Sequence, residues 1–245
     1  MINVLIPMGG RGQRFRNAGY TTTKPLISVN GVPMIKRVID NLDVKATFIF
    51  LVSEEDEKEH NLTQLLTEFC GDNKCQVVLE NPNNRQGAAA ACLLAEHLID
   101  NDNELLVVNS DQLIDWNSAD FFNAMHSQNA DGGIITFTAT ESKWSFAKLI
   151  PGTAIISEVA EKKPISDKAT VGVYWFKQGH DFVQGVKQMM SKQIKTNGEY
   201  YVCPVFNEVI GMGKQIYDYP ITTMHGIGTP EDLERYLNEI NKPQG

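Results

Sequence analysis

A glycine-rich segment near the start of the chain carries residue types that bind phosphate. An apolar run over Ile2–Pro7 predicts a strand, and the segment Met8–Gly12 that follows has glycine at three of its five positions. Glycine lacks a Cβ atom, so backbone N–H groups can approach a polyanion closely there. Arg14 and Lys24 add two positive charges shortly afterwards. Amides and cations gathered after a first strand are the groups that a triphosphate requires.

Two common phosphate-binding motifs are absent from the sequence. The dinucleotide fingerprint GxGxxG would need a third glycine where the chain has Phe15. The P-loop ends in Gly-Lys-Ser or Gly-Lys-Thr, whereas the Gly213-Lys214 pair is followed by Gln215. The glycine-rich segment is therefore expected to bind a nucleotide in a different way.

An acidic residue follows a second buried strand. Leu105–Val108 is wholly apolar and leads into Asn109-Ser110-Asp111. In open α/β sheets, ligands bind outside the carboxyl ends of the strands. Asp111 is thus expected at the same edge of the sheet as the glycine-rich segment.

The elements that must position these residues alternate between strand and helix in the first half of the chain. Such alternation is typical of a mostly parallel sheet covered by helices on both faces. After about residue 132 strands predominate, which indicates a mixed sheet. We expect one domain over residues 1–245 with two halves, residues 1–130 and residues 131–245. The predicted fold is a Rossmann-like three-layer α/β/α sandwich. Its expected strands are Ile2–Pro7, Ala46–Val52, Gln76–Leu79, Leu105–Val108, Gly133–Thr138, Ala154–Val159 and Thr170–Phe176; its expected helices are Pro33–Leu42, Glu54–Phe69, Gln86–Leu98, Asp181–Ser191, Pro204–Gly211 and Pro230–Asn241.

Composition narrows the class of protein further. The 245 residues carry 22 basic and 30 acidic side chains, a net charge of −8, which disfavours nonspecific binding to nucleic acid or to an anionic membrane. The longest apolar run, Ala88–Ala95, is too short to span a bilayer. The first residues lack the basic head and cleavage site of a signal peptide, so we expect a cytoplasmic protein. Four cysteines without CxxC or zinc spacing predict reduced thiols.

The motifs GGxGxRF and KPL, found here as Gly9–Phe15 and Lys24–Leu26, resemble the sugar-phosphate nucleotidyltransferases, or nucleotide-sugar pyrophosphorylases. The resemblance runs in order from residue 2 to about residue 240. It implies a fold of the nucleotide-diphospho-sugar transferase type, a loop that wraps the triphosphate, and an aspartate that ligates Mg²⁺. Asp111 matches that aspartate, and Arg14 and Lys24 match the catalytic cations. The nucleotide-binding positions implied are Met8, Gly9, Gly10, Gly12, Gln86, Gly87 and Ser110, of which Gln86 and Gly87 would contact the base.

The same resemblance implies where the acceptor binds. The family carries Glu-Lys-Pro followed by a strand with glycine, and the chain has Glu161-Lys162-Lys163-Pro164 and then Gly172. The glutamate would contact the acceptor and a lysine would hold its phosphate. Lys163 is next to the proline and Lys162 is next to the glutamate, so both lysines stay candidates. Glu199 is a further expected contact.

One position departs from the family pattern. Sugar nucleotidyltransferases usually have a second metal-binding aspartate a few residues after Gly-Glu, but Pro204 stands at or near its place. Asn207 or Glu208 is the expected substitute, with Asn207 preferred as the second metal ligand. The departure also puts a standard sugar 1-phosphate acceptor in doubt.

These features together predict an enzyme that transfers NMP from an NTP to a phosphorylated small molecule, foremost a sugar 1-phosphate, with Mg²⁺ as cofactor. The products would be pyrophosphate and an NDP-sugar. One alternative is a cytidylyltransferase that acts on a polyol phosphate or a phosphorylated amide. Another is a relative that binds NTP without turnover. By association with the family, the pathway would be surface or capsule polysaccharide synthesis. The sequence selects neither the base nor an oligomeric state, and a homo-oligomer stays open.

Overall fold

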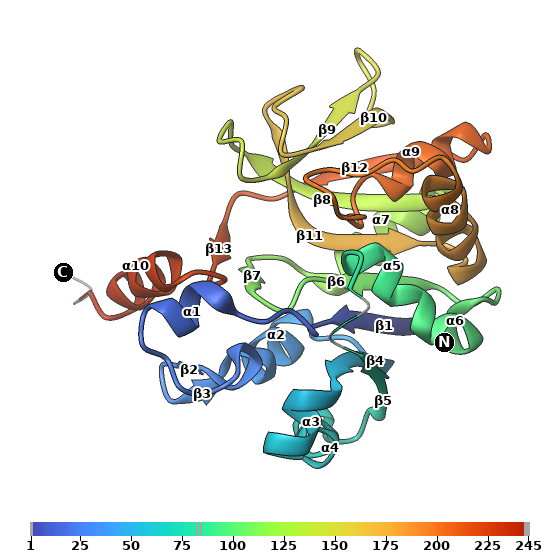
Figure 1. Cartoon of the computed structure of the whole chain (residues 1–245). Coiled ribbons are helices and arrows are strands. Elements are labelled where there is room, and N and C mark those ends of the chain that lie inside the picture. The colour runs from blue at the N-terminus through green and yellow to red at the C-terminus, as the bar shows by residue number, and fades with distance from the viewer. Residues whose placement is uncertain (1, 82, 84, 243–245) are drawn as a thin grey trace.

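The computed structural model describes residues 2–81, 83 and 85–242; the remaining residues, including both ends of the predicted 1–245 domain, lie outside the described part. Within it, nine strands form one mixed sheet in which a path β10-β9-β11-β6-β1-β4-β5 is extended by β8 and β12 (Figure 1). These strands are β1 (Ile2–Pro7), β4 (Ala46–Ser53), β5 (Lys74–Glu80), β6 (Leu105–Val108), β8 (Gly132–Thr138), β9 (Ser145–Leu149), β10 (Ile156–Glu161), β11 (Lys168–Phe176) and β12 (Ile216–Pro220).

Two hydrophobic cores lie on opposite faces of this sheet. Along β1, Val4 and Ile6 belong to one core and Leu5 to the other, as the two-residue period of a strand requires. The first core includes side chains of α2 (Met34–Leu42), α4 (Leu62–Cys70) and α7 (Ser118–Ser127). The second includes those of α5 (Ala88–Cys92), α6 (Glu96–Ile99), α8 (Gly179–Ser191) and α9 (Val205–Gly211). The predicted three-layer α/β architecture with a mixed sheet is confirmed.

Smaller elements complete the described chain. They are α1 (Gln13–Asn17), α3 (Glu54–His60), α10 (Pro230–Ile240), the hairpin β2 (Ser28–Val29) and β3 (Val32–Pro33), the pair β7 (Gln112–Ile114) and β13 (Met224–Gly226), and the short 3₁₀ helices Lys24–Leu26 and Leu93–Ala95. No helix among residues 2–81, 83 and 85–242 is both long and apolar enough to cross a bilayer. The four cysteines are thiols, three of them buried and Cys75 partly exposed.

Several predicted boundaries are wrong for local reasons. The helix expected over Glu54–Phe69 is divided at Asn61, whose φ of 49° is left-handed, and the Glu57 carboxylate then accepts a hydrogen bond from the Thr63 N–H at 2.8 Å. The helix expected from Gln86 begins at Ala88 and is interrupted by a 3₁₀ turn. The strands β9 and β12 are absent from the sequence prediction. Both mix polar and apolar residues (SFAKL in β9 and IYDYP in β12) and lack the continuous apolar run of β6.

Parallel pairing brings the predicted ligand-binding segments to one edge. β1 pairs in parallel with both β4 and β6, so the segments after Pro7 and after Val108 leave the sheet on the same side. The antiparallel strand β11 crosses beside β6, and the Asn109 N–H donates to the Gly172 carbonyl at 2.8 Å. β13 pairs with β7 and returns the C-terminal segment to this edge, where the Ile227 N–H donates to the Asp111 carbonyl at 2.9 Å.

Two helix glycines far from this edge provide a test of packing. A Cβ at Gly179, the first residue of α8, would lie 2.0 Å from the Ile99 carbonyl oxygen, whereas one at Gly211 in α9 meets no atom of the described structure within 4 Å. We expect Gly179→Ala to lower the free energy of unfolding by about 1–3 kcal/mol through overpacking. We expect Gly211→Ala to raise it by about 0.4–1 kcal/mol because alanine restricts the unfolded chain. Urea denaturation of both variants measures the difference, and equal effects would contradict the packing seen at Gly179.

Candidate active site

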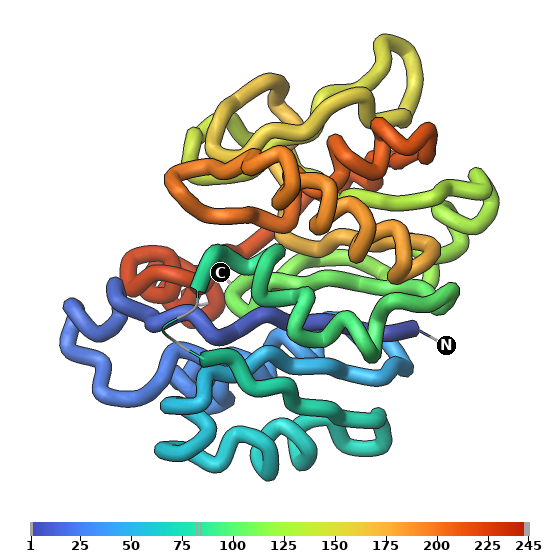
Figure 2. Tube along the Cα trace, turned by 45° about the vertical axis from the view of Figure 1, so that its right-hand side comes forward, coloured from blue at the N-terminus to red at the C-terminus, as the bar shows by residue number. Residues whose placement is uncertain are grey.

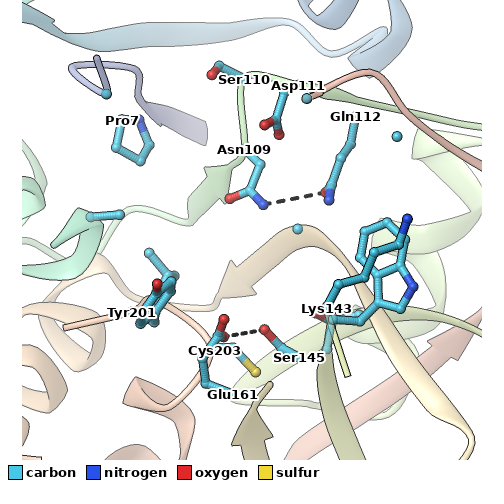
Figure 3. Close-up of a pocket in the computed structure, with 18 of the residues that line it drawn as sticks. Pro7, Asn109, Ser110, Asp111, Gln112, Lys143, Ser145, Glu161, Tyr201 and Cys203 are labelled. Carbon is cyan, nitrogen blue, oxygen red and sulfur yellow. Dashed lines mark hydrogen bonds between the residues drawn. The ribbon is translucent and has the colours of Figure 1, made fainter. Parts of the chain in front are cut away.

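A cavity of about 630 Å³ opens at the edge where β1 and β6 end. The glycine-rich loop after β1 and the Asn109–Gln112 segment after β6 form one wall. The start of β9, the end of β10, the middle of β11 and residues 201–203 form the other. In Figure 3, Ser110 and Asp111 lie on one side of this space and Tyr201, Glu161 and Cys203 on the other. The cavity therefore joins the two groups of residues that the sequence assigned to nucleotide and acceptor.

The glycine-rich loop contributes both of its predicted cations to the cavity. Met8, Gly10, Arg14 and Lys24 line it. The Met8 N–H donates to the Leu51 carbonyl of β4 at 3.0 Å, which extends the parallel β1–β4 pairing to the first residue of the loop. Gly9 and Gly12 lie in the same loop, and Gly12 has a left-handed φ of 58° just before α1. A Cβ there would lie 3.0 Å from the Lys24 Cβ, so glycine lets α1 begin against Lys24.

Lys24 and Asp111 form an ion pair across the cavity. The Lys24 Nζ lies 2.5 Å from the Asp111 Oδ2, and the side chains are 19% and 24% exposed. Asp111 also faces Gly228, where a Cβ would lie only 2.4 Å from the same oxygen. No pattern in the sequence predicts this contact, because Gly228 reaches Asp111 only through the pairing of β13 with β7. Glycine at position 228 therefore lets the Asp111 carboxylate pack directly against the backbone there.

Asp111 can hold a magnesium ion only together with oxygen ligands from the substrate. Among the described residues, no group of three or more His, Cys, Asp or Glu side chains is placed to hold a metal. Mg²⁺ is often held by one or two carboxylates together with substrate phosphates and waters. The carboxylate of Asp111 lines the cavity beside Arg14 and Lys24, where a triphosphate could supply the other oxygen ligands, and so it suits such a site.

The second predicted metal ligand is not brought to the cavity. The Asn207 side-chain amide accepts from the Val159 N–H at 2.9 Å and donates to the Val159 carbonyl at 2.8 Å, which ties α9 to β10. Glu208 is buried and pairs with the Lys192 Nζ at 2.6 Å. Neither residue is among the described residues that line the cavity. Tertiary contacts thus occupy both side chains away from the cavity, and the expectation that Asn207 or Glu208 replaces a metal ligand stays a prediction that this geometry does not favour.

The acceptor side of the cavity carries an anchored lysine and a buried glutamate. The Lys162 Nζ donates to the Tyr201 hydroxyl at 2.6 Å and lies 4.4 Å from the centre of that ring. Glu161 accepts a hydrogen bond from the Ser145 hydroxyl (Figure 3). Burial raises the pKa of the Glu161 carboxyl, while the bond from Ser145 and the charge of Lys162 act in the opposite direction.

The structure separates the two candidate lysines. Lys162 has a left-handed φ of 55°, which turns its side chain into the cavity, whereas Lys163 is exposed and is not among the described lining residues. Gly172 does line the cavity, and a Cβ there would lie 2.1 Å from the Gln112 Oε1. Glycine is thus required for β11 to pass beside the segment after β6.

Three further predicted residues lie at the margin rather than in the lining. The Gln86 side chain is exposed, and its carbonyl accepts from the Tyr200 N–H at 2.8 Å. Gly87 has a φ of 113°, and a Cβ there would lie 2.5 Å from the Tyr200 backbone. Glu199 is exposed in a turn with Thr196. Gln86 and Gly87 therefore anchor the segment that carries Tyr201, and their contact with a base stays a prediction.

Ser110, another predicted nucleotide-binding residue, is buried and lines the cavity.

The cavity also contains residues to which the sequence assigned no role. Gln112, Lys143, Trp144, Tyr201 and Asp232 line it. The Asn109 side-chain amide donates to the Gln112 Oε1 at 3.5 Å (Figure 3). Lys143 lies 3.3 Å from an Asp232 carboxylate oxygen and 4.5 Å from the centre of the Trp144 ring. These residues come from four separate segments, so no local spacing could have grouped them.

Comparison with known proteins agrees with this geometry. The model of a family described as nucleotidyl transferase matches residues 3–241. A mannose-1-phosphate guanyltransferase of Schizosaccharomyces pombe is 25% identical over 179 residues, which cover 71% of this chain and 49% of that protein. The bifunctional protein GlmU of Methanococcus aeolicus is 24% identical over 178 residues, covering 71% and 40%. The matched region thus spans about half or less of these relatives.

Solved structures share the fold along nearly the whole chain. A nucleoside-diphosphate-sugar pyrophosphorylase from Vibrio cholerae RC9 superposes with a TM-score of 0.81 at 24% identity, covering 96% of this chain and 99% of that one. A UDP-glucose pyrophosphorylase in complex with UDP-glucose gives 0.76 at 18% identity, covering 98% of each chain. Since the family model also covers nearly every residue, the protein belongs to the nucleotidyl transferase family.

Proposed function

We propose that the protein transfers a nucleoside monophosphate from an NTP to a phosphorylated acceptor, most directly a sugar 1-phosphate, and releases pyrophosphate. The supporting observation is one cavity in which Arg14, Lys24 and Asp111 face Glu161 and Lys162. The names of the relatives, among them guanyltransferases that act on mannose 1-phosphate, agree with a sugar phosphate as acceptor.

The chemistry needs no base from the protein. An acceptor phosphate is already largely ionised at pH 7, because its second pKa is about 6. Its oxygen attacks the α-phosphorus, a new O–P bond forms, and the bond to the β-phosphate oxygen breaks in line, so that pyrophosphate leaves. The protein then contributes position and charge. Oriented binding can lower such a barrier by about 7–11 kcal/mol.

The cations have separate tasks in this scheme. Arg14 and Lys24 neutralise charge on the triphosphate. Lys162, which is positioned by its hydrogen bond to the Tyr201 hydroxyl, holds the acceptor phosphate. Asp111 is the residue that would hold Mg²⁺, and the ion when bound offsets further charge on the phosphates. Glu161 and Ser145 offer acceptors and a hydroxyl to polar groups of the acceptor molecule.

We further propose a cytoplasmic location, a division into a nucleotide-binding half (1–130) and an acceptor-binding half (131–245), and a role in surface-polysaccharide synthesis. A panel of acceptors that includes sugar 1-phosphates, a polyol phosphate and a phosphorylated amide, each tested with the four NTPs, would separate a sugar enzyme from the cytidylyltransferase alternative. NTP binding without pyrophosphate release from any acceptor would favour a non-catalytic relative.

Lys24→Met tests the donor side of the cavity. We expect loss of this cation to raise the barrier by about 3–4 kcal/mol, by analogy with loss of one oxyanion donor, which lowers kcat about 10²–10³-fold. Pyrophosphate release under saturating substrates is the measurement. Lys36→Met is the matched control, because Lys36 pairs with Asp40 on the exposed face of α2. A fully active Lys24→Met variant would refute the role assigned to Lys24.

Tyr201→Phe tests the acceptor side. The variant keeps the ring beneath Lys162 but removes the hydroxyl that bonds its Nζ. A hydrogen bond to a charged group contributes about 1.5 kcal/mol, so we expect KM for the acceptor to rise about tenfold while KM for the NTP stays unchanged. Tyr217→Phe on β12 is the control, since its hydroxyl bonds Gln215. An equal rise in both KM values would point to a general structural effect instead.

A further inference from the structure

The carboxylate expected to hold Mg²⁺ already carries a cation on one of its oxygens. The Lys24 Nζ donates to the Asp111 Oδ2 at 2.5 Å. A Cβ at Gly228 would lie 2.4 Å from the same oxygen, so the C-terminal segment packs against it as well. In both views this segment, with β13 and α10, lies beside the N-terminal segment with α1 (Figures 1 and 2). Protein atoms thus surround Oδ2 in the protein alone.

Lys24 can leave this carboxylate only by rotation of its side chain. It begins the 3₁₀ helix Lys24–Leu26, in which Pro25 is buried. A Cβ at Gly12 would lie 3.0 Å from the Lys24 Cβ, so the glycine-rich loop packs on the first carbon of the side chain. The ammonium group beyond this carbon lines the cavity together with Arg14 and the loop. Both the carboxylate and a bound triphosphate are therefore candidates for the same cation.

A free metal ion would find little net negative charge at Asp111. The Lys24 charge offsets that of the carboxylate and repels a second cation beside it, and such interactions are stronger where water is largely excluded. Among the described residues no group of three or more His, Cys, Asp or Glu side chains is placed to add ligands. Asp232, another acidic residue of the cavity, is bound by Arg235 at 2.6 Å.

A triphosphate changes this balance. Its negative charge attracts Lys24, and the Asp111 carboxylate then becomes available to a divalent ion together with phosphate oxygens. Without a metal, the carboxylate that Lys24 leaves behind would repel the phosphates. Metal and triphosphate each remove the obstacle to the other, and such coupling between two ligands is reciprocal in free energy.

We propose that Lys24 shields Asp111 from free metal ions, so that the protein binds its divalent cation and its triphosphate together, as a metal–nucleotide complex. Lys24 is then a positioning residue for the metal site as well as a ligand of the triphosphate. The inference rests on the proposed function for the place of the triphosphate. It adds the form in which the donor is bound.

Binding of Mn²⁺ to full-length, nucleotide-free protein tests the shielding, with free Mn²⁺ measured by electron paramagnetic resonance. We expect wild-type protein and Asp111→Asn to bind Mn²⁺ equally. Lys24→Met removes the competing charge, so we expect at least about tenfold tighter binding, which the added Asp111→Asn change abolishes. Lys24→Arg is the matched control, because it keeps the charge and should behave as the wild type.

Binding of inorganic tripolyphosphate, followed by calorimetry, tests the reciprocal effect without dependence on the base. In EDTA we expect Asp111→Asn to bind it at least about fivefold more tightly than the wild type, because Lys24 is released and the repelling carboxylate is gone. In Mg²⁺ we expect the order to reverse. Glu158→Gln removes an exposed carboxylate on β10 and should match the wild type in both solutions.

A wild-type Mn²⁺ site that Asp111→Asn abolishes would overturn the inference even if no Lys24 variant folds. Equal Mn²⁺ binding by the wild type and a folded Lys24→Met variant would also overturn it. So would unchanged or weaker binding of metal-free tripolyphosphate by Asp111→Asn. If both effects are found but no acceptor yields pyrophosphate, the proposed function fails and the inference stands. If neither tripolyphosphate nor any NTP binds in Mg²⁺, both fail.

Discussion

The contact between Lys24 and Asp111 holds the candidate site together. It joins segments 87 residues apart in the chain at 2.5 Å, and both side chains are largely withdrawn from water. Burying a charge without a partner costs free energy, so each residue of the pair offsets the cost of burying the other's charge. The pair also brings a cation for the triphosphate next to a carboxylate suited to a divalent ion. A polyanionic substrate would find both groups already assembled, which reduces the ordering that binding requires.

Close backbone approaches give the cavity its shape. Gly87, Gly172 and Gly228 each occupy a position where a Cβ would come within 2.5 Å of a neighbouring atom. At Gly87 that neighbour is the backbone before Tyr201, at Gly172 it is Gln112, and at Gly228 it is Asp111. Three segments distant in sequence can therefore meet around one space. Gly87 and Gly172 also have positive φ, a conformation that other residues rarely adopt.

The acceptor side of the cavity keeps a carboxylate largely out of water. Burial raises the pKa of the Glu161 carboxyl, and the hydrogen bond from Ser145 and the charge of Lys162 act in the opposite direction. Hydrogen-bonding capacity kept out of water favours ligands that can supply the missing donors. The aromatic ring of Tyr201 serves a different purpose, because it fixes a flexible lysine rather than presenting a charge.

The sequence by itself determined most of the strands and helices in order, though not β9, β12 or α7. It also determined the glycine-rich loop with its two cations, Asp111 at the end of β6, and the Glu161–Lys162 segment. Those features are local: hydrophobic periods, turn residues and charges within a few positions of one another. Only the tertiary structure decided that Lys162 rather than Lys163 enters the cavity, that Asn207 ties α9 to Val159, and that Gly228 lies against Asp111. Each of these contacts depends on how distant segments pack together or on the φ of a single residue. The spacing of residues along the chain reveals neither the packing nor the φ.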